Sequence, residues 1–247
     1  MAVTETWIQD GVCDGELFGD SYVVYRKDRN LNALNVSRGG GVLIGVRHDL
    51  ISSRIDLSYL EAQLPAIDVV GCRVVIHGKS VYLFVIYIQP NSPTEHYEAL
   101  FDFFSTFPPI QNEKVIFLGD FNIQFFTNLE IRNPRLVLIR DFISFFDMQQ
   151  LNDARNEHNY VLDLALSNID CAVNATDLPF VPEDAYHPAF NATFYFKAIN
   201  NVLSDFPRNS NNRNYKICLR ALKMYNVFLS LVVRTSICFS HFKRDSL

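Results

Sequence analysis

Apolar and polar residues alternate over much of the first 196 positions, the period-two pattern of half-buried β-strands. Two further segments carry apolar residues three or four positions apart, which predicts amphipathic helices. One opens at Ser92-Pro93-Thr94-Glu95, where a capping box is combined with proline at the first helical position, and the other opens at Asn133-Pro134. The strands before and after Gly78-Lys79 are predicted to pair as a hairpin. The predicted strands are Ala2–Thr4, Tyr22–Tyr25, Gly41–Arg47, Asp68–His77, Ser80–Ile88, Lys114–Leu118, Val161–Leu166 and Phe190–Phe196.

This order of elements predicts an α+β fold, because strand runs interrupted by few helices favour two packed sheets with helices outside them. We expect one domain over residues 1–198, built as a four-layer α/β/β/α sandwich of two mixed sheets. Residues 199–214 are rich in Asn, Ser and Arg and are predicted to be a linker. Residues 215–247 are predicted to form a basic helical tail, with one amphipathic helix over 215–233.

Composition places the chain among soluble globular proteins of reducing compartments. Of its 247 residues 49% are apolar and 20% charged, which supports a core and excludes a disordered chain. The five cysteines are odd in number and never spaced Cys-x-x-Cys, so neither a disulfide framework nor a zinc site is predicted. No signal-peptide pattern follows Met1, and the run Tyr225–Val233 is far shorter than the roughly 20 residues of a membrane span. We expect an intracellular protein, nuclear or cytoplasmic, that is not secreted and has no membrane partner.

Charge is distributed unevenly. Residues 201–247 hold eight Lys or Arg and two Asp, which leaves 14 basic and 25 acidic residues in positions 1–200. A basic tail on an acidic body is suited to nucleic-acid phosphates. A solvated helix face explains the tail equally well.

The strongest chemical signal is Gly119-Asp120-Phe121-Asn122, directly after the apolar run at 115–118. Because strand side chains alternate, Asp120 and Asn122 are predicted to point to the same side of the sheet. An acid and an amide held together at the end of a buried strand suit metal-dependent phosphoester chemistry.

Four other residues acquire meaning only together with these two. Asp163 is a lone acid in an apolar strand, and a buried carboxylate needs a partner, for which His187 is the natural candidate. Seen alone, Glu5 is more typical of a surface acid and Tyr87 of a core tyrosine. The glycine run at 39–41 is better explained by a tight turn feeding a strand than by a phosphate cradle, since no helix start follows it.

In this chain order the motifs resemble those of the endonuclease/exonuclease/phosphatase superfamily, with its DNase I-like fold. The likeness is closest to the apurinic-type endonuclease domain of non-LTR (LINE-like, especially jockey-like) retrotransposons, and it extends over about residues 2–196. The segments that carry it are Thr4-Glu5-Thr6-Trp7, Tyr22–Arg29, Ser37–Ile44, Tyr87–Asn91, Gly119–Asn122, Leu162–Asn168 and Val181–Pro188.

The resemblance implies a role for each matching position. Glu5 matches the principal Mg²⁺ ligand, with Mn²⁺ as the alternative ion, and Tyr87 matches the tyrosine that hydrogen-bonds the scissile phosphate. Asp120 matches the acid that orients or deprotonates water, and Asn122 the amide that holds the phosphate. His187 matches the histidine facing the phosphate, oriented by Asp163. DNA is the implied partner; protein partners are not indicated.

The chain also departs from the family pattern. It begins three residues before Thr4-Glu5, so the family's first strand and helix, with their active-site Asn, are missing. Loss of an internal strand would expose backbone and apolar surface. Where many relatives have Ser-Asp-His, this chain has Ala185-Tyr186-His187, with an acid only at Asp184, and the usual tryptophan after Asn122 is missing. Three functions stay open: a metal-dependent DNA endonuclease that nicks target DNA for reverse transcription, a catalytically inactive truncated remnant with at most weak nucleic-acid binding, and a phospholipid or inositol-phosphate phosphatase. The segments at 38–41 and 186–188 disfavour the third.

Overall fold

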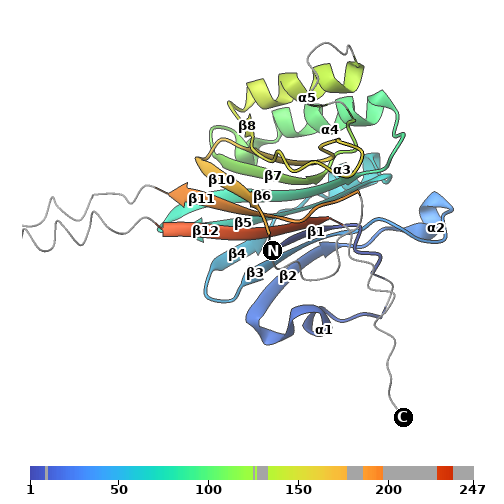
Figure 1. The fold of residues 1–247 in the computed structure, drawn as a ribbon. Coiled ribbons are helices and arrows are strands. Elements are labelled where there is room, and N and C mark those ends of the chain that lie inside the picture. Colours follow the sequence, from blue (N-terminus) through green and yellow to red (C-terminus); the bar gives the residue numbers. More distant parts are fainter. Residues whose placement is uncertain (9–10, 125, 127–132, 177–185, 197–226, 236–247) are drawn as a thin grey trace, which may run out of the picture.

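Two six-stranded mixed sheets pack against each other in the computed structural model (Figure 1). The structure describes residues 1–8, 11–124, 126, 133–176, 186–196 and 227–235. The predicted α+β sandwich of two packed mixed sheets is confirmed. The predicted linker at 199–214 lies outside the described residues, as does most of the predicted tail.

The first sheet holds the strands that end at the predicted chemical motifs. Its order is β4-β5-β6-β7-β9-β8, with β6 and β7 parallel and every other neighbouring pair antiparallel. Side chains of β6 alternate between its two faces, so that one set meets the helices and the other meets the second sheet. The strands are β4 (Ile51–Arg54), β5 (Ile67–Ile76), β6 (Lys79–Ile88), β7 (Lys114–Asp120), β8 (Gln149–Gln150) and β9 (Asp163–Ser167).

The second sheet has the order β10-β11-β12-β1-β3-β2, and only β1 and β12 are parallel. β1 contacts β6 and β7 of the first sheet, which brings the end of β1 to the interior of the sandwich. The strands are β1 (Ala2–Thr4), β2 (Tyr22–Lys27), β3 (Val42–Arg47), β10 (Cys171–Ala175), β11 (Phe190–Phe196) and β12 (Val227–Thr235).

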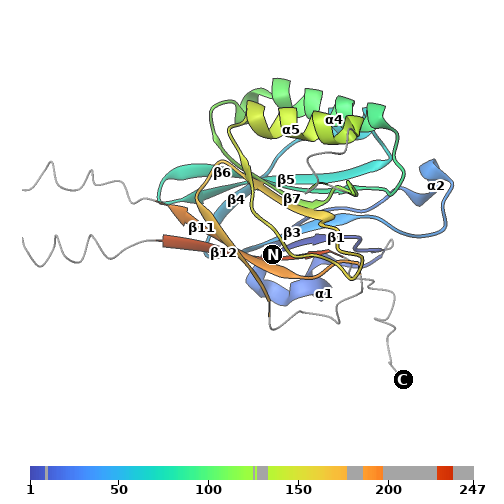
Figure 2. The ribbon, with the colours of Figure 1, turned by 45° about the horizontal axis from the view of Figure 1, so that its top comes forward.

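The prediction of a helix over residues 215–233 is wrong for its last part. Residues 227–235 form β12, which pairs with β11 on one side and with β1 on the other (Figure 2). The edge of β1 that was expected to be left open by a missing strand is therefore paired. The segment Val227–Val233 is rich in β-branched and large apolar residues, which favour a strand once two edges are available for pairing. Sequence periodicity alone does not separate a short apolar strand from a helix.

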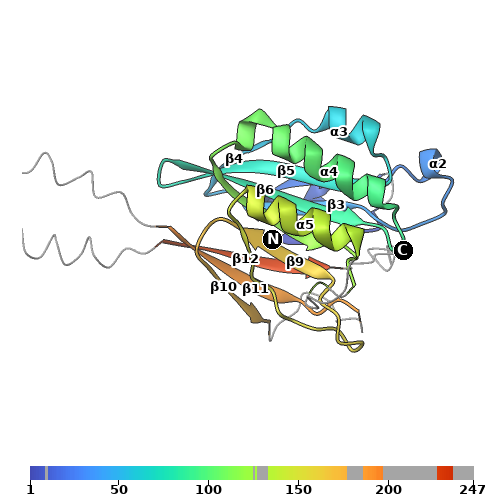
Figure 3. The same ribbon diagram turned by 90° about the horizontal axis from the view of Figure 1, so that it is seen from above.

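Helices cover the two outer faces unequally. Figure 3 shows α4 and α5 side by side over the first sheet, where phenylalanines make up much of the core. On the outside of the second sheet the described residues provide only the short α1 (Figure 1). No described helix has the length and apolar character needed to cross a membrane. The helices are α1 (Asp14–Phe18), α2 (Leu31–Leu34), α3 (Ser58–Gln63), α4 (Thr94–Thr106) and α5 (Pro134–Phe145), with 3₁₀ turns at Gly19–Ser21 and Pro108–Ile110.

Two local details differ from the predictions. The capping box at the start of α4 is not formed, because Pro93 occupies the N-cap position and no side chain caps the helix. The hairpin between β5 and β6 turns at His77 and Gly78, one residue earlier than predicted, since Ile76 pairs with Lys79. Both turn residues have positive φ, as a two-residue type I′ turn requires. The second helix starts as predicted, and the Asn133 side chain accepts a hydrogen bond from the Arg135 backbone N–H.

Candidate functional site

Four polar residues form one row across the four central strands of the first sheet, at one end of these strands. Asp68 of β5 is paired with Tyr87 of β6, Tyr87 with Asp120 of β7, and Asp120 with Asp163 of β9. Residues that are direct neighbours across strands point to the same face. All four are buried, between 0% and 4% exposed, on the face that meets the second sheet. Three carboxyl groups in one buried row have a large desolvation cost, which marks a site rather than a plain core.

The histidine joins this row between two of its carboxylates. His187 Nδ1 lies 3.0 Å from an oxygen of Asp163, and its Nε2 lies 3.8 Å from an oxygen of Asp120. Its side chain is 11% exposed, so the ring is enclosed but reaches the surface. The strand β11 begins three residues after His187 and so fixes the chain close to it. The buried acid predicted to require a histidine partner therefore has one.

The amide reaches the site through a bend in the chain after β7. Gly119 has φ +133°, and any side chain there would overlap the backbone carbonyl of Ile86 in the adjacent strand. Asn122 has φ +49°, a left-handed conformation that is unfavourable for a non-glycine residue. Its backbone N–H and side-chain NH₂ both donate to Asp120, at 2.9 and 2.7 Å, and the NH₂ also donates to the Ile88 carbonyl at 2.8 Å. These bonds offset the strain and fix the amide beside the carboxylate.

The glutamate comes from the second sheet. Glu5 follows β1 directly and has φ +50°, so the chain leaves the strand in a left-handed turn. The next two residues are fixed by backbone bonds, from Thr6 N–H to the Gly41 carbonyl and from Trp7 N–H to the Gly40 carbonyl. The glycine run is thus a turn that holds the strand of Glu5, in agreement with the turn interpretation of the sequence.

Two pKa shifts link the glutamate to the row. Burial raises the pKa of the Tyr87 hydroxyl, and a hydrogen bond with the Glu5 carboxylate raises it further. Burial also raises the pKa of the Asp120 carboxyl well above its usual range. The negative charge of Asp163 raises this pKa further, and His187 lowers it. Glu5 adds to the same negative field at Asp120. This arrangement of carboxylates is stabilised by an added positive charge.

A buried ion pair supports the site from behind and was not predicted. Arg29 donates to one oxygen of Asp68 from Nε at 2.9 Å, and a second nitrogen of its guanidinium lies 2.6 Å from that oxygen. Gly41 N–H donates to the same oxygen at 2.8 Å. The guanidinium also lies over the Tyr87 ring, 5.0 Å from its centroid, and a side chain at Gly40 would overlap the pair. Asp68, like Asp163, is a lone acid in an apolar strand, so the sequence pattern that indicated a partner for Asp163 also indicated one for Asp68.

The donor atoms present fit a divalent cation. Ligand atoms of Asp120, Asp163 and His187 all lie within 4.8 Å of one another. One oxygen of Asp163 is buried without a hydrogen-bond partner among the described residues. Oxygen donors suit Mg²⁺ and Mn²⁺. His187 contacts only one oxygen of Asp163. The oxygens available to a cation are therefore the second oxygen of Asp163 and the Asp120 carboxylate, on whose pKa the charge of Glu5 acts.

All six residues predicted from the sequence converge on one region of the sandwich. Tyr87, Asp120 and Asp163 stand in the buried row, while Asn122 and His187 contact its carboxylates. Glu5 reaches Tyr87 from the second sheet. The structure thus brings together side chains from position 5 to position 187, and the role of each remains a prediction.

Comparison with known proteins gives structural neighbours only; no protein-family model and no curated protein sequence matches the chain. The catalytic domain of human Nocturnin with a bound sulfate anion aligns over 73% of each chain, with 14% identity and a TM-score of 0.50. The endonuclease domain of TRAS1, a telomere-specific non-LTR retrotransposon, aligns with 15% identity and a TM-score of 0.43 over 59% of this chain. The chain spans 64% of that domain. D. rerio TDP2 complexed with single-strand DNA product aligns over 72% of this chain and 78% of its own, with 14% identity and a TM-score of 0.43.

At 14% identity the likeness to the Nocturnin domain concerns the architecture alone. The fold of this chain is the DNase I-like sandwich of the endonuclease/exonuclease/phosphatase proteins.

Proposed function

We propose that the chain is a metal-dependent phosphodiesterase that nicks DNA, acting as the endonuclease domain of a non-LTR retrotransposon. The observation that carries the proposal is the convergence of the carboxylates of Asp120 and Asp163 with His187, Asn122 and Tyr87 at one end of the sandwich. Asp68 has Arg29 as its cation, whereas Asp120 and Asp163 are two buried carboxylates that share one histidine, an arrangement typical of a catalytic or metal site.

We assign the cation to Glu5 with Asp120 beside it. When bound there, a divalent ion neutralises charge on the phosphoryl oxygens and makes the phosphorus more electrophilic. Placement in the Asp120–Asp163–His187 cluster is the competing assignment. The two differ in one respect, since removal of the Glu5 carboxylate weakens metal binding only in the first.

The protein groups supply positioning and proton transfer. Asp163 holds the imidazole of His187 through Nδ1, which leaves Nε2 directed toward the Asp120 side, where a phosphate oxygen can accept a hydrogen bond from it. The Asp120 carboxylate orients the attacking water and takes its proton. The Asn122 amide donates one N–H to Asp120 and the other to the β6 carbonyl, so it holds the Asp120 carboxylate in position, and it contacts the phosphate by exchanging one of these two bonds.

The test is nicking of supercoiled plasmid in Mg²⁺ or Mn²⁺ by the full chain. We expect conversion to the open circle, with a loss of about 10²- to 10⁴-fold in His187→Ala and Asp120→Asn, the range typical of general acid–base groups. Glu5→Gln should raise the metal concentration needed for half-maximal nicking, because it removes the carboxylate to which the cation is assigned. Glu98→Gln, an exposed acid on α4, is the matched control and should behave as wild type.

The other outcomes decide between the remaining functions. DNA binding without nicking in a folded wild-type chain would contradict the enzyme and support the inactive remnant. Cleavage of inositol phosphates or phospholipids in preference to DNA would contradict the DNA substrate while keeping the same chemistry.

A further inference from the structure

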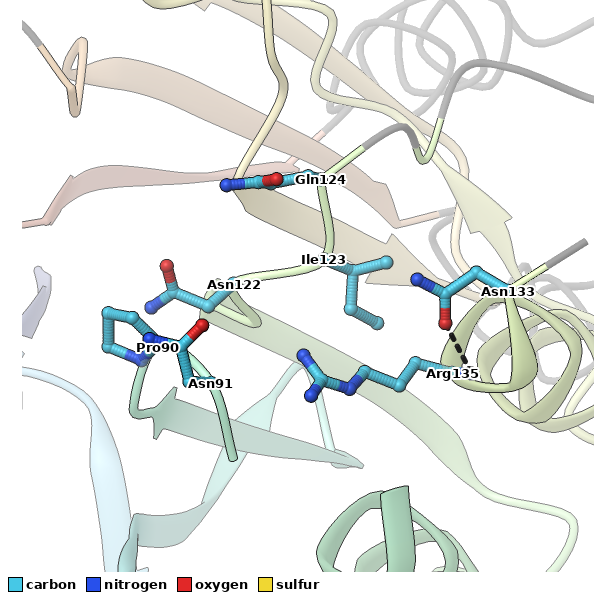
Figure 4. Close-up of a pocket in the computed structure, with 7 residues that line it drawn as sticks. All are labelled: Pro90, Asn91, Asn122, Ile123, Gln124, Asn133 and Arg135. Atoms are coloured by element: carbon cyan, nitrogen blue, oxygen red, sulfur yellow. Dashed lines mark hydrogen bonds between the residues drawn. The ribbon is translucent and has the colours of Figure 1, made fainter. Parts of the chain in front are cut away.

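A small polar concavity lies next to the site and shares Asn122 with it (Figure 4). It is formed where three elements end or begin: the turn after β6, the segment after β7 and the start of α5. Its volume is about 110 Å³, which is small against the roughly 300–1,000 Å³ of pockets for drug-sized ligands. The polar side chains that line it are Asn91, Asn122, Gln124, Asn133 and Arg135.

The lining has one charge, and it is positive. Of the described residues that line it, Arg135 is the cation, the other polar groups are neutral amides, and none is an acid. Among the described residues no carboxylate forms an ion pair with Arg135. The body of the chain carries far more acidic than basic residues, so a cation with no acid beside it among the described residues differs from the net charge of the body.

The guanidinium is held in place before any ligand arrives. It lies over the ring of Tyr97, 5.2 Å from the centroid, and that ring is fully buried with its hydroxyl donating to the Phe121 carbonyl at 2.8 Å. Figure 4 shows the Arg135 side chain reaching from the start of α5 toward Asn91. A planar, pre-ordered guanidinium loses little conformational entropy on binding and matches the oxygens of a phosphate in pairs.

The concavity is physically coupled to the reaction centre. Asn122 lines it and at the same time donates to Asp120, at 2.7 Å. Because the two places share Asn122, a strand of nucleic acid with one phosphate over Asp120 can extend so that a neighbouring phosphate enters the concavity. Neutral amides and one guanidinium suit a singly charged phosphodiester, and the volume leaves no room for a base.

We propose that this concavity binds a backbone phosphate of the nucleic-acid strand, adjacent to the phosphate that is cleaved, and that Arg135 is its cation. This inference rests on the proposed function, because it takes the strand from that site. Such a contact holds the strand in register and carries no base information.

The first experiment measures binding of a fluorescein-labelled DNA duplex by anisotropy in EDTA, where cleavage does not proceed, at several NaCl concentrations. Arg135→Gln keeps the length and polarity of the side chain and removes its charge. We expect affinity to fall about 5- to 10-fold at low salt, equally for unrelated sequences, and the slope of log K against log [salt] to fall by about 0.9, the value for one phosphate contact. Thermal unfolding should show the variant folded.

Lys79→Ala is the matched control. Lys79 is an exposed cation at the opposite end of β6, about 30 Å along a ten-residue strand from the residues next to the concavity. It should change neither the affinity nor the salt slope. Arg135→Lys should restore the slope but only part of the affinity, because an ammonium lacks the paired donors of a guanidinium.

The second experiment replaces single phosphates of the DNA by uncharged methylphosphonates. We expect wild type to lose affinity when one phosphate next to the cleaved bond is replaced, and Arg135→Gln to be insensitive to replacement of that phosphate alone.

Equal sensitivity of both proteins at every position would overturn the phosphate site, and so would a salt slope of Arg135→Gln like that of wild type. Either result would leave nicking, and so the proposed function, intact. If inorganic phosphate competes with DNA in wild type but not in Arg135→Gln, while no methylphosphonate position is affected, the concavity takes free phosphate and the strand assignment is overturned. Absence of both nicking and DNA binding in folded wild type would overturn the two proposals together.

Discussion

Substitution of Arg29 by Met is the most informative perturbation of this fold. It keeps the apolar stem and removes the guanidinium, so the Asp68 oxygen that accepts from Arg29 and Gly41 keeps only the Gly41 N–H. The other Asp68 oxygen already has no partner among the described residues. The side chains of Arg29 and Asp68 are 3% and 1% exposed, so water does not replace the lost donors.

The expected magnitude follows from this burial. Breaking a buried ion pair by removal of one partner costs about 3–5 kcal/mol, because the remaining charge is left uncompensated. For a chain of this size each kcal/mol lowers Tm by about 2–4 °C, so a fall of roughly 6–20 °C is expected for Arg29→Met. The double variant Arg29→Met/Asp68→Leu removes both charges, leaves the Gly41 N–H without its acceptor and removes the long 3.5 Å bond from Arg29 to the Ala66 carbonyl. We expect it to lie about 1–2 kcal/mol below wild type, with a coupling energy of about 2 kcal/mol or more.

Wild type, Arg29→Met, Asp68→Leu and the double variant form a double-mutant cycle. Urea unfolding followed by circular dichroism measures the stability of these four proteins, and plasmid nicking measures their activity. We expect the double variant to be folded and yet slow, because Tyr87 loses the guanidinium behind its ring and the turn that holds Glu5 loses an anchor. A loss below about 1 kcal/mol in Arg29→Met would refute the reasoning on burial. Full nicking by the double variant would refute the link between the ion pair and the site.

Three further predictions concern single positions. Gly119→Ala should destabilise the fold by at least about 2–4 kcal/mol in urea unfolding and abolish nicking, because a side chain there overlaps the Ile86 carbonyl at φ +133°; near-wild-type stability would contradict the close approach of β6 and β7. The raised pKa of the Asp120 carboxyl penalises its ionised form in the fold, so this residue's contribution is most favourable below the unfolded pKa of about 4 and is lost as pH rises through the folded pKa. In EDTA, Asp120→Asn should therefore gain stability relative to wild type between about pH 5 and pH 8, and a difference independent of pH would argue against a buried, strained carboxylate. Burial raises the pKa of the Cys72 thiol to about 12, so iodoacetamide should label the exposed Cys13 in native protein and Cys72 only after unfolding, as mass spectrometry of the two peptides will report.

Prediction from sequence succeeded where a residue's position along one element is sufficient. The period of two places Tyr87 and Asp120 at the ends of buried strands, and the stripe of the second helix begins at its Asn-Pro start as expected. Prediction from sequence failed where a residue's interaction partner lies far away along the chain. The segment after 226 was predicted to be a helix, and only the open edges of β1 and β11 make it a strand. Asp68 was overlooked because the cation that pairs with it, Arg29, lies 39 positions earlier in the chain.

The sequence by itself determined the local elements, the α+β class and the identity of the groups able to do phosphoester chemistry, since periodicity and side-chain type are properties of the chain alone. Only the tertiary structure decided which groups meet. The register of four strands aligns Asp68, Tyr87, Asp120 and Asp163 in one row, and packing of the second sheet on the first brings Glu5 to it. Left-handed turns at Glu5 and Asn122 are held by bonds to neighbouring strands. Such positions are set by long-range contacts, whose energies outweigh local preference and leave no periodic trace in the sequence.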